Sequence, residues 1–331
     1  MGDSQPRVSS HLGYFGSGGD RYNLGGYKKA VAPLDRLRAV AQVKGLDGVE
    51  LNYPALVAEE TVDQVKSVLA ETGLQVSNVS LNLWGDAKWG HGSLSSPDPA
   101  TRAEALSTMK RGMAVAKAVG SPLVSLWPGQ DGFDYSFEMD YGAAIDWFIE
   151  GMQQAAAQDP DMRICLEYKA KEPRMRLLVD TAARTMWLIH KIGAPNVGVM
   201  LDVGHAFQAG ENPAQSAVLL QREGLLDIIH FNDNYGDWDG DMIPGTVRFW
   251  ENLELVFWLR RLGYAKWCSI DISAPRGDPV KACQQSVDNI RRFYRLVDVL
   301  PSEEILANLR RTDHTANLRA ISDRIFAGLG I

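Results

Sequence analysis

Cysteine is scarce in this sequence, with three in 331 residues. Cys165, Cys268 and Cys283 are too widely spaced for a disulfide framework or a Cys-x-x-Cys metal site. Long apolar runs are also missing, because none approaches the roughly 20 residues that a membrane-spanning helix requires. The first ten residues have no apolar signal core. We therefore expect a soluble, cytoplasmic protein with reduced thiols and no membrane partner.

Basic charge is also under-represented. The sequence has 34 Lys and Arg against 41 Asp and Glu, a formal net charge of -7, and it has no basic tract. This balance argues against a nucleic-acid partner. The remaining composition is that of an ordinary globular protein, and the length suffices for two domains or for one barrel-sized domain.

What the sequence does contain is an alternation of short apolar runs with longer segments of helical periodicity. Eight such pairs predict an α/β protein, a (β/α)8 TIM barrel. An open doubly wound sheet is the alternative, but the Gly-rich segment 14–26 lacks the G-x-G-x-x-G spacing of its phosphate loop. The expected strands are residues 8–15, 48–53, 75–84, 123–127, 163–169, 197–204, 226–233 and 266–273.

Two units are expected along the chain. Residues 1–298 form the predicted barrel, with the Gly-rich segment as a flexible loop at its mouth. Residues 299–331 are predicted to be a C-terminal helical extension of one or two helices. The extension could pack against the outside of the barrel or form an oligomer contact, and the sequence does not choose between them.

Polar residues end the last four expected strands. In a TIM barrel these ends form one rim, which carries the active site. Three carboxylates placed together repel, and their burial is unfavourable unless a cation joins them. We therefore predict a divalent metal, with Mn²⁺ favoured by oxygen donors plus one nitrogen and Mg²⁺, Co²⁺ or Zn²⁺ as alternatives. The predicted ligands are Glu167, Asp202, His230 and Asp271.

Further polar residues surround this predicted centre. Lys169 lies two positions after Glu167 and shares its strand face, so its ammonium can stabilise an oxygen that becomes negative in the transition state. Asp239 and Asp241 lie in the acidic loop after His230. This loop could hold a second ion or clamp substrate hydroxyls, and a plain solvated turn is the alternative.

A base is also needed for carbonyl chemistry on a metal. His205, three residues after Asp202, and His91 are the candidate proton shuttles, because histidine titrates nearest to the working pH. A Lewis acid, a cation for the negative oxygen and a base would together complete the set of groups that such chemistry requires.

These segments resemble the xylose-isomerase-like TIM-barrel superfamily, which includes sugar isomerases and epimerases. LEYKAKEPR at 166–174 is similar to the EPKPxEPR segment of the family, in which the Glu binds metal and the Lys assists the carbonyl oxygen. That resemblance assigns these roles to Glu167 and Lys169. LDVGHAFQAGE, HFNDNYGDWDGDM and SIDIS resemble the segments that supply the other ligands, a nearby His and a D-x-D loop.

Two upstream segments resemble the walls of the family's sugar site. VSLWPGQDGFDYSFEMDY is similar to the Trp-bearing segment of the fourth strand, and LNLWGDAKWGHG is similar to the aromatic loop of the third. By this resemblance, with His11 added from the first strand, the expected substrate-binding residues are His11, Trp84, Trp89, Trp127, Gln130 and Asp131.

One feature departs from the aldose isomerases of the family, which open the pyranose ring with an early-strand His–Asp pair. Here the second expected strand has no His, and we expect His11 to lack an Asp partner. This departure favours the branch of C-glycoside deglycosidase alpha subunits, which resemble this chain in length. Those proteins act on 3-oxo-glucosides, which need no ring opening, and they pair with a small beta subunit.

The expected function is that of a divalent-metal-dependent sugar isomerase or epimerase, which removes a proton next to a carbonyl through an enediolate. Metal-assisted elimination from a 3-oxo-C-glucoside is the alternative within the family. A non-catalytic sugar-binding or assembly subunit with a structural metal is the alternative from another class. A three-zinc nuclease is disfavoured by the six His and the negative charge. The expected partners are a small sugar or glycoside and a homo-oligomer, or a beta subunit in a deglycosidase.

Overall fold

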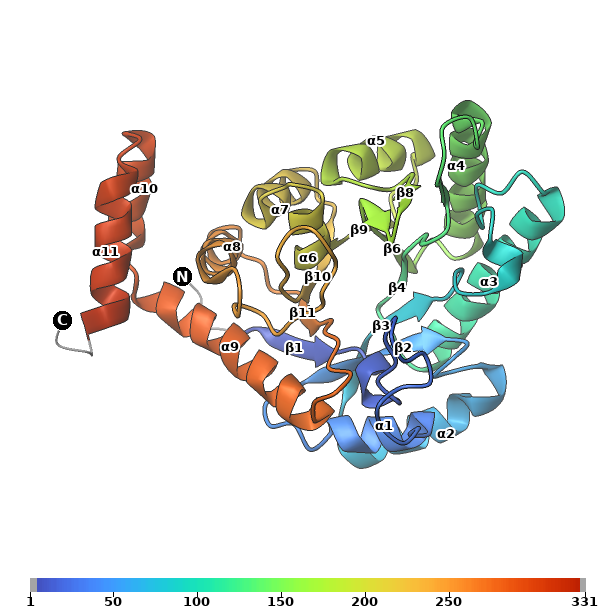
Figure 1. Ribbon diagram of the computed structural model, residues 1–331, viewed down its shortest axis with the longest axis horizontal. Helices are drawn as coiled ribbons and strands as arrows, with labels where there is room; N and C mark the ends of the chain where they lie inside the picture. The colour runs from blue at the N-terminus through green and yellow to red at the C-terminus, as the bar shows by residue number, and fades with distance from the viewer. Residues whose placement is uncertain (1–4, 328–331) are drawn as a thin grey trace.

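The computed structural model describes residues 5–327, which form a closed barrel of parallel strands surrounded by helices (Figure 1). The strand order around the barrel is β1-β11-β10-β9-β6-β4-β3-β2. Each neighbouring pair is parallel, so the carboxyl ends of all these strands lie on one face. The prediction of a (β/α)8 TIM barrel is thereby confirmed.

The barrel strands are short and mostly buried, because helices cover their outer faces and side chains fill the interior. The first expected strand ends early, because Gly13–Phe15 forms a 3-10 turn (η1) instead. Three further short strands, β5, β7 and β8, form a separate antiparallel sheet (Gly132–Phe133, Lys171–Glu172 and Met175–Leu177). The barrel strands are β1 (Arg7–Ser10), β2 (Gly48–Tyr53), β3 (Gln75–Leu81), β4 (Leu123–Leu126), β6 (Arg163–Glu167), β9 (Val197–Asp202), β10 (Leu226–Phe231) and β11 (Trp267–Ile270).

A helix follows each barrel strand. Several begin at a side chain that accepts backbone hydrogen bonds of the first turn, as Asp98 and Asp278 do. No helix in the described part of the chain is both long and apolar enough to cross a bilayer. The helices are α1 (Pro33–Val40), α2 (Val62–Thr72), α3 (Pro99–Ala118), α4 (Tyr141–Gln158), α5 (Ala182–Ile192), α6 (Val203–Gln208), α7 (Pro213–Arg222), α8 (Phe249–Arg261) and α9 (Pro279–Val299), with 3-10 turns η2 (Glu59–Thr61) and η3 (Ala87–Trp89).

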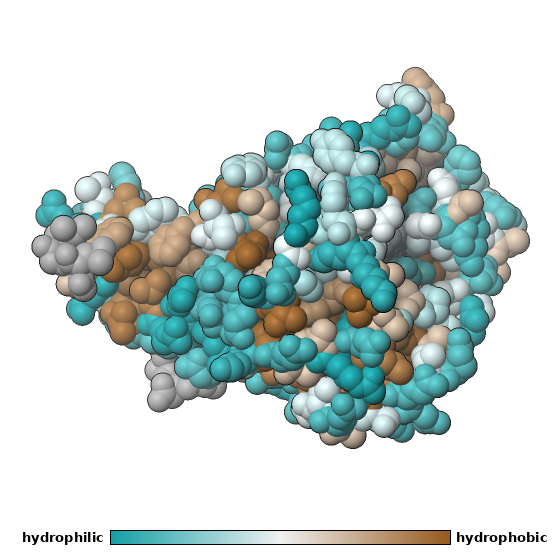
Figure 2. All heavy atoms as spheres, turned by 60° about the horizontal axis from the view of Figure 1, so that its bottom comes forward, coloured by the Kyte–Doolittle hydropathy of each residue, from teal (hydrophilic) through white to brown (hydrophobic). Residues whose placement is uncertain are grey.

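Two more helices, α10 (Ser302–Arg310) and α11 (His314–Phe326), follow the barrel and stand to one side of it (Figure 1). They line an apolar cleft together with α8. Apolar side chains stay exposed on this pair, including Leu309 and Phe326, and Figure 2 shows brown, apolar surface there. Helices therefore follow the barrel as predicted. The first four residues of the predicted barrel unit (1–4) and the last four of the predicted extension (328–331) lie outside the described residues.

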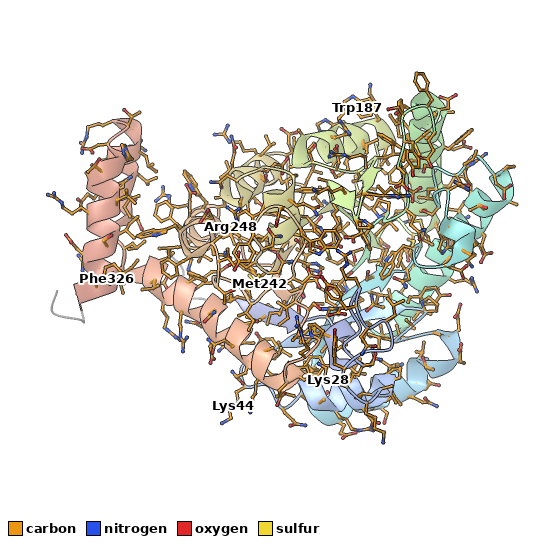
Figure 3. All side chains as sticks on the ribbon, viewed as in Figure 1. Lys28, Lys44, Trp187, Met242, Arg248 and Phe326 are labelled. Atoms are coloured by element: carbon orange, nitrogen blue, oxygen red, sulfur yellow. The ribbon has the colours of Figure 1, made fainter. Side chains whose placement is uncertain are left out.

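The Gly-rich segment between η1 and α1 has no helix or strand. Lys28, labelled in Figure 3, attaches this segment to the loop after β11. Its Nζ donates hydrogen bonds to the backbone oxygens of Ala274 and Gly277 at 2.8 and 3.0 Å. The segment thus forms part of the wall at the carboxyl-terminal face of the barrel, beside β1 and β11.

Candidate metal centre

The carboxyl ends of β6, β9, β10 and β11 bring four side chains with metal-binding atoms together. Glu167 and Asp202 are the last residues of β6 and β9, His230 is next to last in β10, and Asp271 directly follows β11. One ligand-type atom of each lies within 4.8 Å of the others. The structure therefore places the residues predicted to be metal ligands in one cluster.

His230 lies at the centre of the cluster. Its Nδ1 is 3.3 Å from Oε1 of Glu167 and 3.1 Å from Oδ2 of Asp271. The same atom is 3.7 Å from Oδ2 of Asp202, and it is buried without a hydrogen-bond partner. The other ring nitrogen, Nε2, lies 3.0 Å from Oε1 of Glu50. Because an ionised carboxylate only accepts, a neutral His230 carries its proton on Nε2 and directs the Nδ1 lone pair into the cluster.

The charge balance of the cluster suits a cation. Burial lowers the pKa of His230, but the carboxylates of Glu50, Glu167 and Asp271 outweigh burial and raise that pKa well above its ordinary value. A divalent ion would offset more negative charge than this proton does. The donor set of three carboxylates and an unpaired ring nitrogen is one that Mn²⁺ and Mg²⁺ accept, with Co²⁺ and Zn²⁺ also compatible. The residues therefore fit a divalent metal.

Asp202 is oriented by two hydrogen bonds. Its Oδ1 accepts from the backbone N of His205 at 2.7 Å, which caps the start of α6. Its Oδ2 accepts from Nδ2 of Asn232 at 2.8 Å. The carboxylate thus has one fixed direction, as metal ligands commonly have through their hydrogen-bonded neighbours. Asn232, which the sequence analysis did not identify, supplies half of this restraint.

Glu50 on β2 is the main site residue that sequence reasoning misses. It is 2% exposed, and Nδ2 of Asn78 donates to its Oε2 at 3.1 Å. Burial raises the pKa of Glu50, but the charge and hydrogen bonds of His230 outweigh burial and lower it. An acid inside the apolar run GVELNY is the signal in the sequence. Its partner lies 180 residues away, so the run alone does not reveal the purpose of the acid.

Asp239 joins Lys169 to His205. Its Oδ2 lies 2.8 Å from Nζ of Lys169 and 3.1 Å from Nε2 of His205. Lys169 also pairs with Glu172, and its Nζ lies 4.8 Å from the ring centre of Trp127. Burial lowers the pKa of Lys169, but Asp239 and Glu172 outweigh burial and raise that pKa above its ordinary value. Lys169 therefore remains an ammonium.

His205 has one engaged and one unengaged ring nitrogen. Its Nδ1 is buried without a hydrogen-bond partner, 3.5 Å from Oε1 of Glu167. Burial lowers the pKa of His205, but Asp202 and Asp239 outweigh it and raise the pKa to about 9. Asp202, His205 and Asp239 also form a second group of ligand-type atoms. His205 is therefore placed to carry a proton at Nδ1, or to help hold a second ion.

A cavity of about 390 Å³ opens onto the cluster, a volume within the range of small-ligand sites. Trp84 and Trp127 line it, with ring centres 5.1 Å apart. Asp239 and Asp241 line it as well, and Asp241 has a left-handed backbone with φ of 43°. Strained backbone of this kind is concentrated at functional sites. Asp239 and Asp241 of the acidic loop therefore face the cavity, whereas Asp237 of the same loop is exposed to solvent.

Two of the predicted substrate-binding residues have their polar atoms occupied elsewhere. Asp131 is fully buried, and its carboxylate accepts four hydrogen bonds from the backbone N and hydroxyl groups of Ser93 and Ser95. Oε1 of Gln130 accepts from the backbone N of Gly85 at 2.6 Å. Neither residue lines the cavity. Their side chains hold the loops after β3 and β4 in place instead.

Trp89 and His91 also lie outside the cavity lining. Trp89 is 2% exposed and belongs to the hydrophobic core, whereas His91 is exposed to solvent. The 3-10 turn η3, capped by Asp86, carries this part of the chain away from the cavity. Of the two predicted proton shuttles, the structure therefore places only His205 at the cavity.

His11 has an Asp partner, so the expectation that it lacks one is wrong. Its Nε2 lies 3.1 Å from Oδ1 of Asp271 and 3.0 Å from the backbone O of Ile272. Its Nδ1 accepts a hydrogen bond from the backbone N of Gly13 at 3.2 Å. Because Nδ1 accepts, a neutral His11 carries its proton on Nε2, and both nitrogens are engaged. His11 lines the cavity and orients Asp271.

A parallel eight-stranded barrel with a buried acid and histidine cluster at its carboxyl-terminal rim is the architecture of a TIM-barrel active site. Residues 37–293 match the family described as Xylose isomerase-like TIM barrel, and the chain belongs to that family. A curated xylose isomerase from Thermus thermophilus is 30% identical over 219 residues, which is 64% of this chain and 56% of that protein. The chain thus spans little more than half the length of this relative.

Solved structures share the fold. A 3-keto-D-glucoside 4-epimerase from E. coli has a TM-score of 0.66 and 18% identity, covering 87% of this chain and 100% of that chain. A D-tagatose 3-epimerase-like protein has a TM-score of 0.70 and 15% identity, covering 88% of this chain and 98% of that chain. At these identities the similarity establishes the barrel fold and leaves the reaction to be argued from the site.

Proposed function

We propose that the protein is a divalent-metal-dependent sugar isomerase or epimerase that removes a proton next to a carbonyl group. The observation that carries the proposal is that three members of the metal-type cluster (Glu167, His230 and Asp271) border the same cavity as Lys169 and His205. Membership of the xylose isomerase-like family supports a sugar as the substrate. The fit of the donor set to a divalent ion supports the metal dependence.

Glu167, Asp202, His230 and Asp271 would hold the ion. When bound there, a divalent metal would act as a Lewis acid toward a sugar carbonyl and its neighbouring hydroxyl. Lys169 lies at the cavity wall with its charge maintained by two carboxylates. Its ammonium stabilises the substrate oxygen as that oxygen becomes negative, which is an electrostatic role and not a base role.

His205 would carry the proton. When the ring is neutral, Asp239 accepts at Nε2, and the buried Nδ1 of His205 would take a proton from the substrate and return it. Trp84 and Trp127 present apolar ring faces to the cavity, against which the C–H faces of a sugar can pack. These two walls would position the substrate and exclude water from the reacting carbons.

The isomerase or epimerase reaction is preferred over C-glycoside cleavage. The contact of His11 with Asp271 removes one feature that favours the deglycosidase branch, whereas the similarity in length and the lack of a His on β2 remain. A structural metal would not require an ammonium at the wall of the same cavity. Neither alternative has a contact in the described residues that favours it.

The test is metal analysis combined with solvent exchange. We expect about one divalent ion per chain of purified protein, and deuterium from D₂O incorporated next to the carbonyl of a ketose or aldose in a panel followed by NMR. Glu167→Gln should lose the metal. Lys169→Met should keep the metal and lose about 10²-fold or more in exchange rate, whereas Lys171→Met, outside the cavity lining, should be unaffected. Absence of metal, or of exchange with every sugar, would overturn the proposal.

A further inference from the structure

Arg36, on α1, contributes a second cation to the cavity. It is half-buried, and its Nε donates to the backbone O of Val31 at 2.9 Å. Unlike Lys169, it forms no ion pair with any carboxylate in residues 5–327. The terminal nitrogens of its guanidinium are therefore left to bind a ligand or solvent.

The barrel topology places Arg36 and Lys169 on different walls of the cavity. β1, which precedes Arg36, and β6, which precedes Lys169, lie four places apart in the closed ring of eight strands. Strands four places apart in such a ring are on opposite walls. A ligand that reaches Lys169 on one wall of the cavity therefore meets Arg36 on the opposite wall, with the metal-type cluster between the two.

The orientation of Arg36 is fixed by its surroundings. Besides the bond to Val31, the backbone at Gly16 lies against the guanidinium, since a Cβ at that position would be only 2.9 Å from Nη2. The loop that contains Gly16 is itself attached to the barrel by Lys28 (Figure 3). The guanidinium is thus held before any ligand arrives, which reduces the ordering required for binding.

The guanidinium is held in the cavity without a carboxylate partner, so it is open to an anionic ligand. Burial lowers the pKa of Arg36 and no neighbouring acid offsets this, yet a guanidinium stays charged in proteins. Its parallel N–H groups match the two oxygens of a carboxylate or a phosphate. The carboxylates that line the cavity lie beyond ion-pair distance, so they do not satisfy it.

We propose that the substrate is a sugar with an anionic group, a carboxylate or a phosphate, and that Arg36 binds this group at the cavity wall opposite Lys169. The inference rests on the proposed function, which makes the substrate a sugar, and it adds that this sugar carries a negatively charged group. Arg36 is then the specificity-determining residue that separates anionic from neutral sugars.

The test is calorimetric binding of D-glucuronate, D-glucose 6-phosphate and D-glucose to the Mn²⁺-supplemented protein. We expect at least one anionic sugar to bind tenfold or more tightly than D-glucose. Arg36→Gln should abolish that difference and leave D-glucose binding within about twofold. Arg36→Lys should retain more of the preference for phosphate than for carboxylate, because an ammonium is a point charge. Arg38→Gln is the control, since Arg38 lies on the same helix outside the cavity lining.

Equal binding of neutral and anionic sugars by the wild-type protein would overturn the inference. An Arg36→Gln variant that keeps the preference for anionic sugars would also overturn it. So would a variant that binds all three sugars equally more weakly while its circular dichroism spectrum and Mn²⁺ affinity are unchanged. The proposed function fails separately, through absence of metal or of deuterium exchange. A protein that exchanges deuterium into neutral sugars alone would retain the function and lose the inference.

Discussion

A single hydrogen bond determines which nitrogen of His230 is available at the centre of the cluster. Glu50 accepts at Nε2, so the Nδ1 lone pair points toward Glu167, Asp202 and Asp271. Carboxylate partners of this kind fix the tautomer of a metal-binding imidazole and increase its basicity. Glu50 would thus influence a metal held by the cluster without contacting it.

Replacement of Glu50 should therefore weaken metal binding. We expect Glu50→Gln to lower Mn²⁺ affinity by about 10- to 100-fold, because the neutral amide no longer fixes and polarises His230. Calorimetric titration of the metal-free protein measures this. Glu60→Gln, at an exposed position just after Glu59, is the control and should bind as the wild type does. An affinity within twofold of wild type would show that Glu50 does not influence the ion.

The buried thiol of Cys268 predicts a loss of stability in alkali. Burial raises the pKa of this thiol from 9.0 to about 12 in the folded protein. The contribution of the protonated thiol to the free energy of unfolding is complete below pH 9. It is lost as the pH rises toward 12, because the unfolded chain releases the proton first. Between these limits the free energy of unfolding should fall about 1.4 kcal/mol per pH unit more steeply than in Cys268→Ala.

Urea unfolding of both proteins at several pH values between 8 and 11 checks this slope. The Cys268→Ala variant is expected to be less stable at neutral pH, because it leaves a small cavity, so the comparison depends on slopes and not on absolute values. Parallel profiles for the two proteins would show that the thiol does not titrate as expected.

At the level of elements, Asp131 holds the loop after β3 against the start of β5. Its four hydrogen bonds include two from backbone N–H groups, which would be left without partners if the carboxylate were removed. We expect Asp131→Ala to lower the free energy of unfolding by about 3 kcal/mol. Chemical denaturation measures the change, and Asp237→Ala, on the exposed part of the acidic loop, is the control. A change below about 0.5 kcal/mol would contradict the role.

The elements and the meeting of Glu167, Asp202, His230 and Asp271 could be predicted because they follow from local patterns. Alternating apolar and helical segments define the eight strands, and the parallel barrel then brings every strand end to one rim. The expected first strand extends too far because Leu12, Tyr14 and Phe15 continue its apolar pattern, although Gly13–Phe15 forms η1. Burial pattern alone does not distinguish a strand from a short turn.

The contacts that the sequence could not reveal join distant parts of the chain. Glu50 meets His230 across 180 residues, and His11 meets Asp271 across 260. These pairs depend on how the barrel closes and on strand register, which periodicity does not contain. Asp131 shows the converse, because a resemblance of segments placed it at the sugar whereas the loop uses both of its oxygens.

At the level of the whole molecule, a bound ion should stabilise the fold. The clustered carboxylates repel one another without a cation, so chelation should lower the melting temperature. Mn²⁺ at a hundredfold excess over its dissociation constant should add about 2.7 kcal/mol of stability. Differential scanning calorimetry with EDTA or Mn²⁺ tests this, with Asp202→Asn as the variant that should not respond. A wild-type melting temperature independent of both additions would argue against a metal site.

Removal of α10 and α11 should leave the site intact. Every residue assigned to the cavity precedes α9, so a chain ending at Leu300 should bind Mn²⁺ within about threefold of the full-length protein. The truncation would expose the apolar face of α8, including Trp258, and should lower solubility. The expected oligomer stays a prediction, which light scattering on both chains would test. A tenfold loss of affinity would show that the extension supports the site.

Because Glu50 restrains His230, ion binding at the cluster would depend on contact between two distant parts of the chain. The four ligands come from residues 167–271, the second half of the barrel, whereas Glu50 comes from β2, three places from β10 around the ring. A half-barrel that contains every ligand would therefore still have an unrestrained imidazole. An ion at this cluster would bind at full strength only when the two halves of the chain have met, so a measured metal affinity would report on closure of the ring.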